Sequence, residues 1–387
     1  MKERDLIIGQ VSRRKFLGTA ATTIAVSALP LTSTGAPYLS FGAAARTKPA
    51  SKFSGVQIGT ITYSFRNLDP GIEGVLKACV EANCSSIELM SNGIEDWCGA
   101  PKAPARGGMG PGGPPRGARA EAPPQGAGAP PAGAPPAGTP PAGAPPAGAR
   151  GEMPQRGGRA PMTPEQQAAM EKYNAEIKAW RLAPPMDKFA QLKKMFNDAG
   201  VNIHIVKWSP ARWSDEEIDY AFKTAKALGA GAVSDELSLD AAKKLGPFAE
   251  KHGMVVAFHN HMQFATPGFE NDVLKPALAV SKAVKMNFDI GHFFGSTGRH
   301  PNEIINQYKD RIFSLHLKDK TGPKTQPPNA NQVWGQGETP LVDVLLKVRD
   351  EKLPYPCDIE LEYPIAAWST SVKEVRTCVS FARQLLI

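Results

Sequence analysis

Short apolar runs rich in β-branched residues alternate along the chain with longer amphipathic stretches. The short runs predict strands at residues 56–62, 86–90, 201–207, 230–234, 254–259, 285–289, 312–317 and 358–362. The longer stretches predict helices at residues 71–81, 186–199, 215–228, 239–252, 271–283, 340–351 and 372–386. Strands that alternate with helices in this way are typical of parallel βα units.

The number of these units favours a closed barrel over an open sheet. Eight strand and helix repeats close naturally into a (β/α)8 arrangement. No G-x-G-x-x-G turn follows the first predicted strand, as a dinucleotide-binding open sheet would require. The sequence therefore predicts an α/β fold, a single-domain TIM barrel over residues 53–387.

A stretch rich in Pro, Gly and Ala interrupts the barrel pattern at residues 99–161. It contains four PPAG repeats, which begin at Pro130, Pro135, Pro140 and Pro145. Such a segment has almost no apolar side chains to bury, so we expect it to be disordered or polyproline-like. The two strands and one helix before it are too few to make a core alone, so it is interpreted as an insertion after the second strand.

The first 45 residues have the pattern of an export signal. The string Ser-Arg-Arg-Lys-Phe-Leu at residues 12–17 precedes an apolar, small-residue run, and small residues recur at Ala43 to Ala45. This resembles a twin-arginine signal peptide. The resemblance implies the twin-arginine export machinery as a partner and a periplasmic or exported location.

Composition argues against two classes of protein. The formal net charge is +8, but residues 1–45 hold five basic and two acidic side chains and residues 99–161 hold seven and two. The remaining chain is therefore neutral overall, which gives no basic surface for a nucleic-acid partner.

The five cysteines have no C-x-x-C spacing, so neither a disulfide framework nor a zinc knuckle is expected, although the count leaves room for one bridge.

Acidic and histidine side chains follow most of the predicted strands, at the barrel end where an active site lies. They are Glu88, Glu236, His259, His261, Asp289, His292, His316, Asp319, Glu360 and Glu362. A single strand-end histidine or glutamate is more often hydrogen-bonded structure than a ligand. Several from neighbouring strands together indicate a site. Nitrogen and carboxylate donors suit one divalent ion of Mn, Zn, Co or Fe.

Four short strings make the pattern more specific. They are Phe-His-Asn-His at 258–261, Phe-Asp-Ile-Gly-His at 288–292, Leu-His-Leu-Lys-Asp at 315–319 and Asp-Ile-Glu-Leu-Glu at 358–362. Together they resemble the xylose isomerase-like TIM-barrel family, also called sugar phosphate isomerase/epimerase. The resemblance implies one divalent metal held by Glu, Asp, His and Glu from strands 5 to 8, which carries over to Asp289, His316 and Glu360.

The strand 5 position departs from this pattern, because His259 stands where Glu is usual. Either His259 is the fourth metal ligand, or Glu236 or His261 takes that ligand position instead. Removal of a proton from the carbon next to a carbonyl gives an enediolate. The positive charge of a metal would stabilise this intermediate, and the positions of nearby bases would determine the product. We predict catalytic roles for His261, Glu362 and Lys318. We predict substrate binding by Glu88, Glu236, His292 and Asp319.

These observations predict a metal-dependent sugar isomerase or epimerase with a small carbohydrate as substrate, unphosphorylated if the protein is exported. One alternative is a 3-keto-glycoside lyase or hydratase, or an inosose dehydratase-like enzyme. Another is a periplasmic sugar-binding module without turnover. A nuclease of the endonuclease IV type is disfavoured, because it needs three metals and histidines that are absent at the expected positions of strands 2 and 3.

Overall fold

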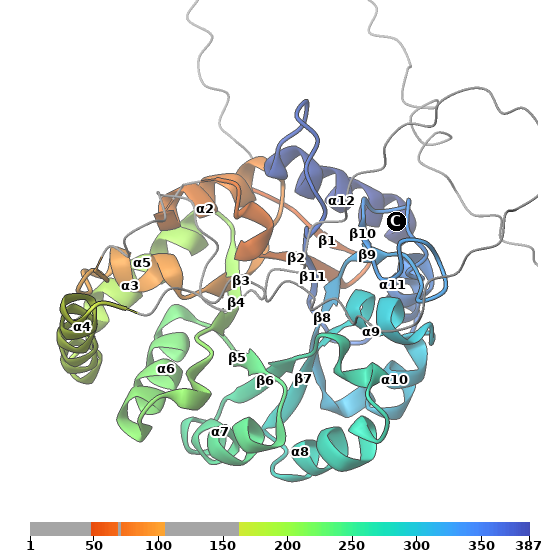
Figure 1. Cartoon of the computed structure of the whole chain (residues 1–387). Helices are drawn as coiled ribbons and strands as arrows, with labels where there is room; N and C mark the ends of the chain where they lie inside the picture. The colour runs from red at the N-terminus through yellow and green to blue at the C-terminus, as the bar shows by residue number, and fades with distance from the viewer. Residues whose placement is uncertain (1–47, 69–70, 105–161) are drawn as a thin grey trace, which may run out of the picture.

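The computed structural model describes residues 48–68, 71–104 and 162–387. The predicted export signal and residues 105–161 of the predicted insertion lie outside these ranges. Figure 1 shows the described part of the chain in a view down the barrel. None of the described helices is long and apolar enough to cross a bilayer.

Parallel strands form a closed ring surrounded by helices (Figure 1). In order around the ring they are β2 (Val56–Ile61), β3 (Ser86–Met90), β4 (Asn202–Lys207), β5 (Ala232–Glu236), β6 (Val255–His259), β7 (Val284–Asp289), β8 (Ile312–Leu317) and β11 (Cys357–Ile359). The ring closes because β2 pairs in parallel with both β11 and β3. The predicted (β/α)8 barrel is therefore confirmed, and each strand lies within a few residues of its predicted position.

The helices that cover the barrel also follow the predicted pattern. They are α2 (Gly71–Glu81), α5 (Met186–Asp198), α6 (Asp215–Leu228), α7 (Leu239–His252), α8 (Lys275–Ala279), α11 (Leu341–Asp350) and α12 (Ser371–Leu386). The start of α6 has a capping box, in which Ser214 and Glu217 satisfy each other's backbone N–H groups. The predicted helix 271–283 is shorter, since α8 follows a π-helical turn, η4 (Glu270–Leu274), and ends at Ala279.

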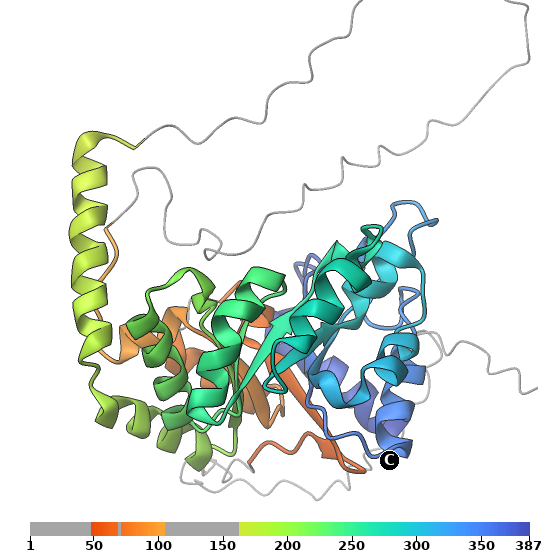
Figure 2. The same ribbon diagram turned by 90° about the horizontal axis from the view of Figure 1, so that it is seen from below.

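Among the described residues, four further α-helices were not predicted: α3 (Asn92–Trp97), α4 (Pro164–Leu182), α9 (Ile290–Thr297) and α10 (Asn302–Gln307). Figure 2 shows α4 standing upright at the outer edge of the barrel. Its last turn is fixed by Arg181, which pairs with Glu95 at 2.8 Å and with Glu217 at 3.0 Å. The guanidinium also lies 3.8 Å from the ring centre of Trp213. This cluster attaches the C-terminal end of α4 to α3 and α6.

The apolar core lies between the sheet and the helices, whereas polar side chains bond to one another inside the barrel. On β3, Ile87 and Leu89 belong to the apolar cluster. The alternate residues Ser86 and Glu88 reach side chains of β4 and β8 instead. The five cysteines are buried and free, so no disulfide bridge forms.

Candidate metal centre

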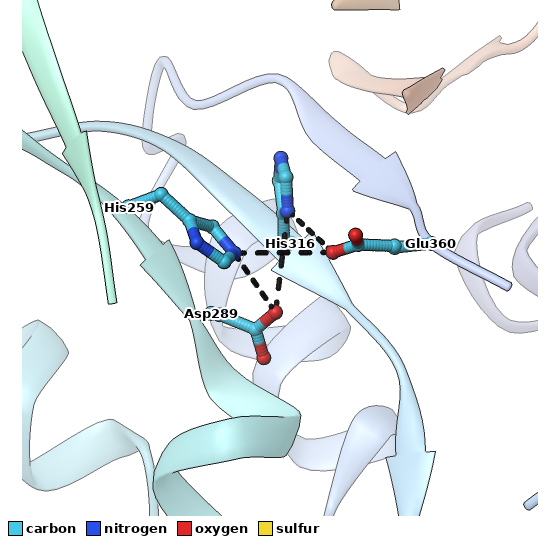
Figure 3. A group of neighbouring side chains, drawn as sticks. All are labelled: His259, Asp289, His316 and Glu360. Atoms are coloured by element: carbon cyan, nitrogen blue, oxygen red, sulfur yellow. Dashed lines mark hydrogen bonds and ion pairs between the residues drawn. The ribbon is translucent and has the colours of Figure 1, made fainter. Parts of the chain in front are cut away.

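Four side chains converge at the carboxyl ends of adjacent strands (Figure 3). They are His259, Asp289, His316 and Glu360, from β6, β7, β8 and the residue after β11, and all are buried. His259 Nε2 lies 3.3 Å from Asp289 Oδ2 and 3.9 Å from Glu360 Oε2. His316 Nδ1 lies 4.0 Å and 2.8 Å from the same two oxygens.

These separations fit a single ion. Atoms that ligate one divalent metal at about 2.0 to 2.2 Å lie roughly 3 to 4 Å from each other. The four atoms could therefore share one ion with little movement. The sequence left three candidates for the fourth ligand. Of these, His259 is the one whose donor atom lies in the same group as those of Asp289, His316 and Glu360.

Asp289 is positioned by its own helix. Its Oδ1 accepts a hydrogen bond from the backbone N–H of His292 at 2.7 Å and so caps α9, while Oδ2 faces the cluster. The side chain of Asn260 accepts from the Asp289 N–H at 2.9 Å and donates to its carbonyl at 3.1 Å. The helix cap and the two hydrogen bonds of Asn260 together hold this carboxylate in one orientation.

Each histidine of the cluster has a carboxylate on its far side. His316 Nε2 donates to Glu88 Oε2 at 2.7 Å, and His259 Nδ1 donates to Glu236 Oε2 at 3.4 Å. His316 Nδ1 and His259 Nε2 are the nitrogens that face the cluster, where an ion would replace their hydrogen bonds to Glu360 Oε2 at 2.8 Å and to Asp289 Oδ2 at 3.3 Å. Carboxylates commonly fix metal-binding histidines in this way.

Glu88 therefore has a different place from the one predicted. Its carboxylate is fully buried and accepts hydrogen bonds from His316, from Asn287 at 2.7 Å and from Ser234 at 3.1 Å. It supports His316 from inside the barrel and does not face a substrate. Burial raises its pKa, but the neighbouring His316 outweighs this and holds the pKa at about 2.

Lys318 extends from the end of β8 into the middle of the site. Its Nζ lies 2.9 Å from Asp289 Oδ2 and 3.0 Å from each of Glu360 Oε2, Glu362 Oε2 and His292 Nε2. An ammonium group has three protons, so it cannot serve all four acceptors at once. An ion bound to Asp289 and Glu360 would leave Lys318 to hold Glu362 and His292.

The close approach of Lys318 to α9 depends on Gly291. A Cβ atom at this position would lie 2.2 Å from Lys318 Cγ and 2.6 Å from the Lys318 carbonyl oxygen. Any larger residue would push Lys318 away.

His292 is held as a neutral ring. Because an ammonium only donates, His292 Nε2 must accept from Lys318, and Nδ1 carries the proton. Burial and the adjacent ammonium hold the pKa of His292 well below its usual value. Within the described residues, this buried Nδ1–H has no hydrogen-bond partner.

The site carries an excess of negative charge. Burial raises the pKa of Asp289 and of Glu360, but Lys318 outweighs this and holds both well below the ordinary range. The side chains that contact the cluster directly or through one neighbour include five carboxylates and two ammonium groups. These are Glu88, Glu236, Asp289, Glu360, Glu362, Lys207 and Lys318. A divalent cation would offset most of this excess.

Two of the three predicted catalytic residues, His261 and Glu362, lie nearer the mouth than Lys318. His261 has 46% of its side chain exposed, and its Nε2 lies 3.1 Å from Glu236 Oε2. Its ring centre is 4.8 Å from that of His259 and 4.9 Å from that of His292. Glu362 is 18% exposed beside Lys318. Sequence reasoning missed Lys207, although it ends the third strand of the ring in the same way as the residues that were selected.

Asp319 was predicted to bind substrate, but its carboxylate is occupied elsewhere. Oδ2 accepts from the N–H groups of Gly335 at 2.8 Å and Gly337 at 2.9 Å, and Oδ1 accepts from Thr339 at 3.2 Å. Asp319 therefore fastens the loop after β8, which contains the hairpin of β9 (Asp319–Lys320) and β10 (Asn331–Gln332).

Comparison with known proteins gives one family and several distant relatives. The model of the xylose isomerase-like TIM barrel matches residues 175–378, just over half of the chain. An inosose dehydratase from Clostridium beijerinckii is 34% identical over 84 residues, which are 22% of this chain and 28% of that protein. The chain thus matches little more than a quarter of this curated relative.

Two solved structures align over most of the chain. A putative uncharacterised protein from Parabacteroides distasonis has 18% identity and a TM-score of 0.48, with 85% of this chain and 99% of that one covered. A probable 3-DHS dehydratase from Bacillus anthracis has 11% identity and a TM-score of 0.47, with 84% and 98% covered. On the match of the family model, this chain belongs to the xylose isomerase-like TIM-barrel family.

Proposed function

We propose that this chain is a divalent-metal-dependent enzyme that isomerises or epimerises a small carbohydrate by removing a proton from the carbon next to a carbonyl. The observation that carries the proposal is the convergence of His259, Asp289, His316 and Glu360, with a carboxylate behind each histidine. A cation bound there supplies the positive charge that stabilises an enediolate.

Two groups near the mouth are placed to move protons. His261 is partly exposed and hydrogen-bonded to Glu236, which orients its ring. Glu362 is partly exposed and ion-paired with Lys318. They extend from the ends of β6 and β11, on two sides of the cluster. The Nδ1–H of His292 is a donor that a substrate oxygen would satisfy.

An elimination is the second candidate reaction. The identity with an inosose dehydratase, though short, favours it. His259 also supports it, because a histidine at this corner removes the glutamate that the family resemblance implies as a base. In a dehydratase the same carbanion expels a hydroxyl group instead of taking a proton.

We further propose that the substrate is unphosphorylated and that the protein acts after export. The two ammonium groups at the site, Lys207 and Lys318, are both paired with carboxylates, so neither is free for a phosphate. The twin-arginine pattern at residues 12–17 points the same way.

The experiment measures the bound metal and then solvent-deuterium incorporation at carbon with keto-sugars, inososes and 3-keto-glycosides. We expect one divalent ion per chain and deuterium exchange with at least one substrate class. The exchange should be abolished in Glu360→Gln and retained in the distant surface variant Glu351→Gln. Product analysis separates isomerisation and epimerisation from water loss. Fully metal-loaded protein that exchanges no substrate proton, or metal-free protein that still binds sugar, would support a binding module instead.

A further inference from the structure

Three consecutive strands of the barrel end in side chains that touch one another. Lys207 ends β4, Glu236 ends β5 and His259 ends β6. Lys207 Nζ lies 2.8 Å from Glu236 Oε1. The other oxygen, Oε2, lies 3.4 Å from His259 Nδ1 and 3.1 Å from His261 Nε2. One carboxylate thus connects an ammonium group, a candidate ligand and a candidate acid/base.

This group is better suited to positioning than to a second metal ion. Glu236, His259 and His261 do offer three donor atoms within 4.8 Å of one another. However, the ammonium of Lys207 lies in contact with the same carboxylate and would repel a second dication. The positive charge that Glu236 needs is already present in the chain.

The carboxylate decides which nitrogen of His259 carries a proton. An ionised carboxylate only accepts hydrogen bonds, so His259 Nδ1 must be protonated to bond with it. Nε2, which lies 3.3 Å from Asp289 Oδ2 and 3.9 Å from Glu360 Oε2, is then the nitrogen left for an ion, which would replace its hydrogen bond to Asp289. The opposite tautomer would direct an N–H at the ion and leave Nδ1 without a donor.

Lys207 keeps Glu236 in this position. The side chain of Glu236 is 41% exposed and by itself is free to turn toward solvent. The side chain of Lys207 is only 12% exposed, and a nearly buried ammonium requires a carboxylate partner. With Oε1 held by Lys207, Oε2 faces the two histidines.

We propose that Lys207 and Glu236 form a positioning pair that sets the Nδ1–H tautomer of His259 for metal binding and orients His261 for proton transfer. The role in metal binding rests on the proposed function. Both residues act through the histidines and are not themselves ligands or bases.

The first test compares metal affinity in Glu236→Ala, Glu236→Gln, Lys207→Met and Lys207→Arg by Zn²⁺ titration against a competing chelator. Loss of a carboxylate behind a metal-binding histidine typically weakens binding about 10- to 100-fold, and we expect this in Glu236→Ala. Lys207→Met should weaken binding less, and Lys207→Arg should restore it, because arginine also pairs with a carboxylate. The matched control is Lys251→Met, which removes an exposed ion pair with Asp219 and should leave affinity unchanged.

The second test is independent of metal. In metal-free protein with ¹⁵N-labelled histidine, NMR reports whether His259 Nδ1 carries a proton that is protected from exchange with solvent. We expect a protected Nδ1–H in the wild type and in Lys207→Arg, and loss of this protection in Glu236→Ala, because the hydrogen bond to Glu236 is gone. Glu236→Gln preserves the shape of the side chain and keeps the test informative if the alanine variant does not fold.

Unchanged Zn²⁺ affinity and an unchanged protection of the His259 Nδ1 proton in the Glu236 variants would overturn the inference, as would binding of two ions per chain. Failure of the wild type to bind any ion would instead refute the proposed function, while the protection of the Nδ1 proton would still decide the role of Glu236.

Discussion

Asp289 uses its two carboxylate oxygens for two different purposes. Oδ1 caps α9, and Oδ2 faces the candidate metal site. Because the two atoms belong to one rigid group, the helix cap fixes the direction of the ligand atom. Substitutions at this residue can therefore separate the two roles.

In Asp289→Asn, the side chain keeps an oxygen that can cap α9 but loses the second oxygen. We expect metal affinity to fall by about 100-fold or more, since an amide nitrogen has no lone pair to offer. Asp289→Ala should lose metal equally and should be less stable than the asparagine variant by about 1 kcal/mol, the usual value of a helix cap. Chelator competition and urea unfolding of the metal-free proteins measure the two effects. An asparagine variant that binds metal as the wild type does would contradict the assignment of Oδ2.

Glu88 should make the stability of the metal-free protein depend on acid pH. Its pKa in the folded state is about 2, below the ordinary value of 4.5, because His316 outweighs the effect of burial. A lowered carboxyl pKa contributes stability above the ordinary value, and this contribution is lost as the pH falls from about 4.5 to about 2. The free energy of unfolding of Glu88→Gln should thus lie about 2 to 4 kcal/mol below wild type at neutral pH, and the difference should shrink in acid. A pH-independent difference would argue against the ion pair.

At the level of helices and strands, the apolar pattern was informative wherever an element packs a row of apolar side chains into the core. The strands and α6 could be predicted for this reason. Helix α4 could not, because Ile177 is its one fully buried residue and its sequence shows no apolar stripe. The signals present were local ones, namely Thr163 and Gln166 as a capping box with Pro164 at the first helical position. Helix α9 was missed because it begins directly after β7.

The attachment of α4 should depend on Arg181. Its guanidinium is nearly buried, pairs with Glu95 and Glu217, and stacks on Trp213. We expect Arg181→Ala to lower the free energy of local opening of α4 by about 2 to 3 kcal/mol, because two largely buried carboxylates lose their cationic partner. Hydrogen exchange in residues 164–182 should then be faster, with metal affinity unchanged. Lys178→Ala, which removes only an exposed pair with Glu216, is the control and should leave exchange unchanged.

The contact between α9 and the segment after β8 gives a prediction at Gly291. In Gly291→Ala, the added methyl group would overlap Lys318 Cγ and the Lys318 carbonyl. Overpacking of this kind typically costs about 1 to 3 kcal/mol. We expect reduced stability by urea unfolding together with weaker metal binding, since Lys318 contacts Asp289 and Glu360. Gly253→Ala at the end of α7 meets no neighbouring atom but is strained by its φ of +61°, so it should lower stability and leave metal binding unchanged.

In the whole molecule, closure of the barrel joins residues that are far apart in sequence. His316 and Glu88 are 228 positions apart, yet they share a hydrogen bond inside the ring. The sequence indicated that both residues follow strands, but register and closure decide which side chain faces a ligand. For this reason the four strand-end residues expected to bind metal do lie together, whereas Glu88 and Asp319, expected to bind substrate, hydrogen-bond to other parts of the protein.

Removal of the metal should destabilise the entire barrel, because its donors come from four adjacent strands and none can bind the ion alone. A ligand that binds only the folded state stabilises it by about 2.7 kcal/mol at a free concentration 100 times its Kd. For a domain of this size each kcal/mol shifts Tm by roughly 2 to 4 °C, so we expect chelation to lower Tm by about 5 to 10 °C. Readdition of the ion should restore it, and Asp289→Asn should show no shift in either direction. Without an ion, a proton on His316 replaces part of the missing charge, because burial lowers the pKa of His316 but Glu88 and Glu360 outweigh this and raise it well above 6.5. The metal-free protein should therefore lose stability as the pH rises above about 6.5. An identical Tm before and after chelation of fully loaded protein would show that the cluster does not hold an ion that contributes to the fold.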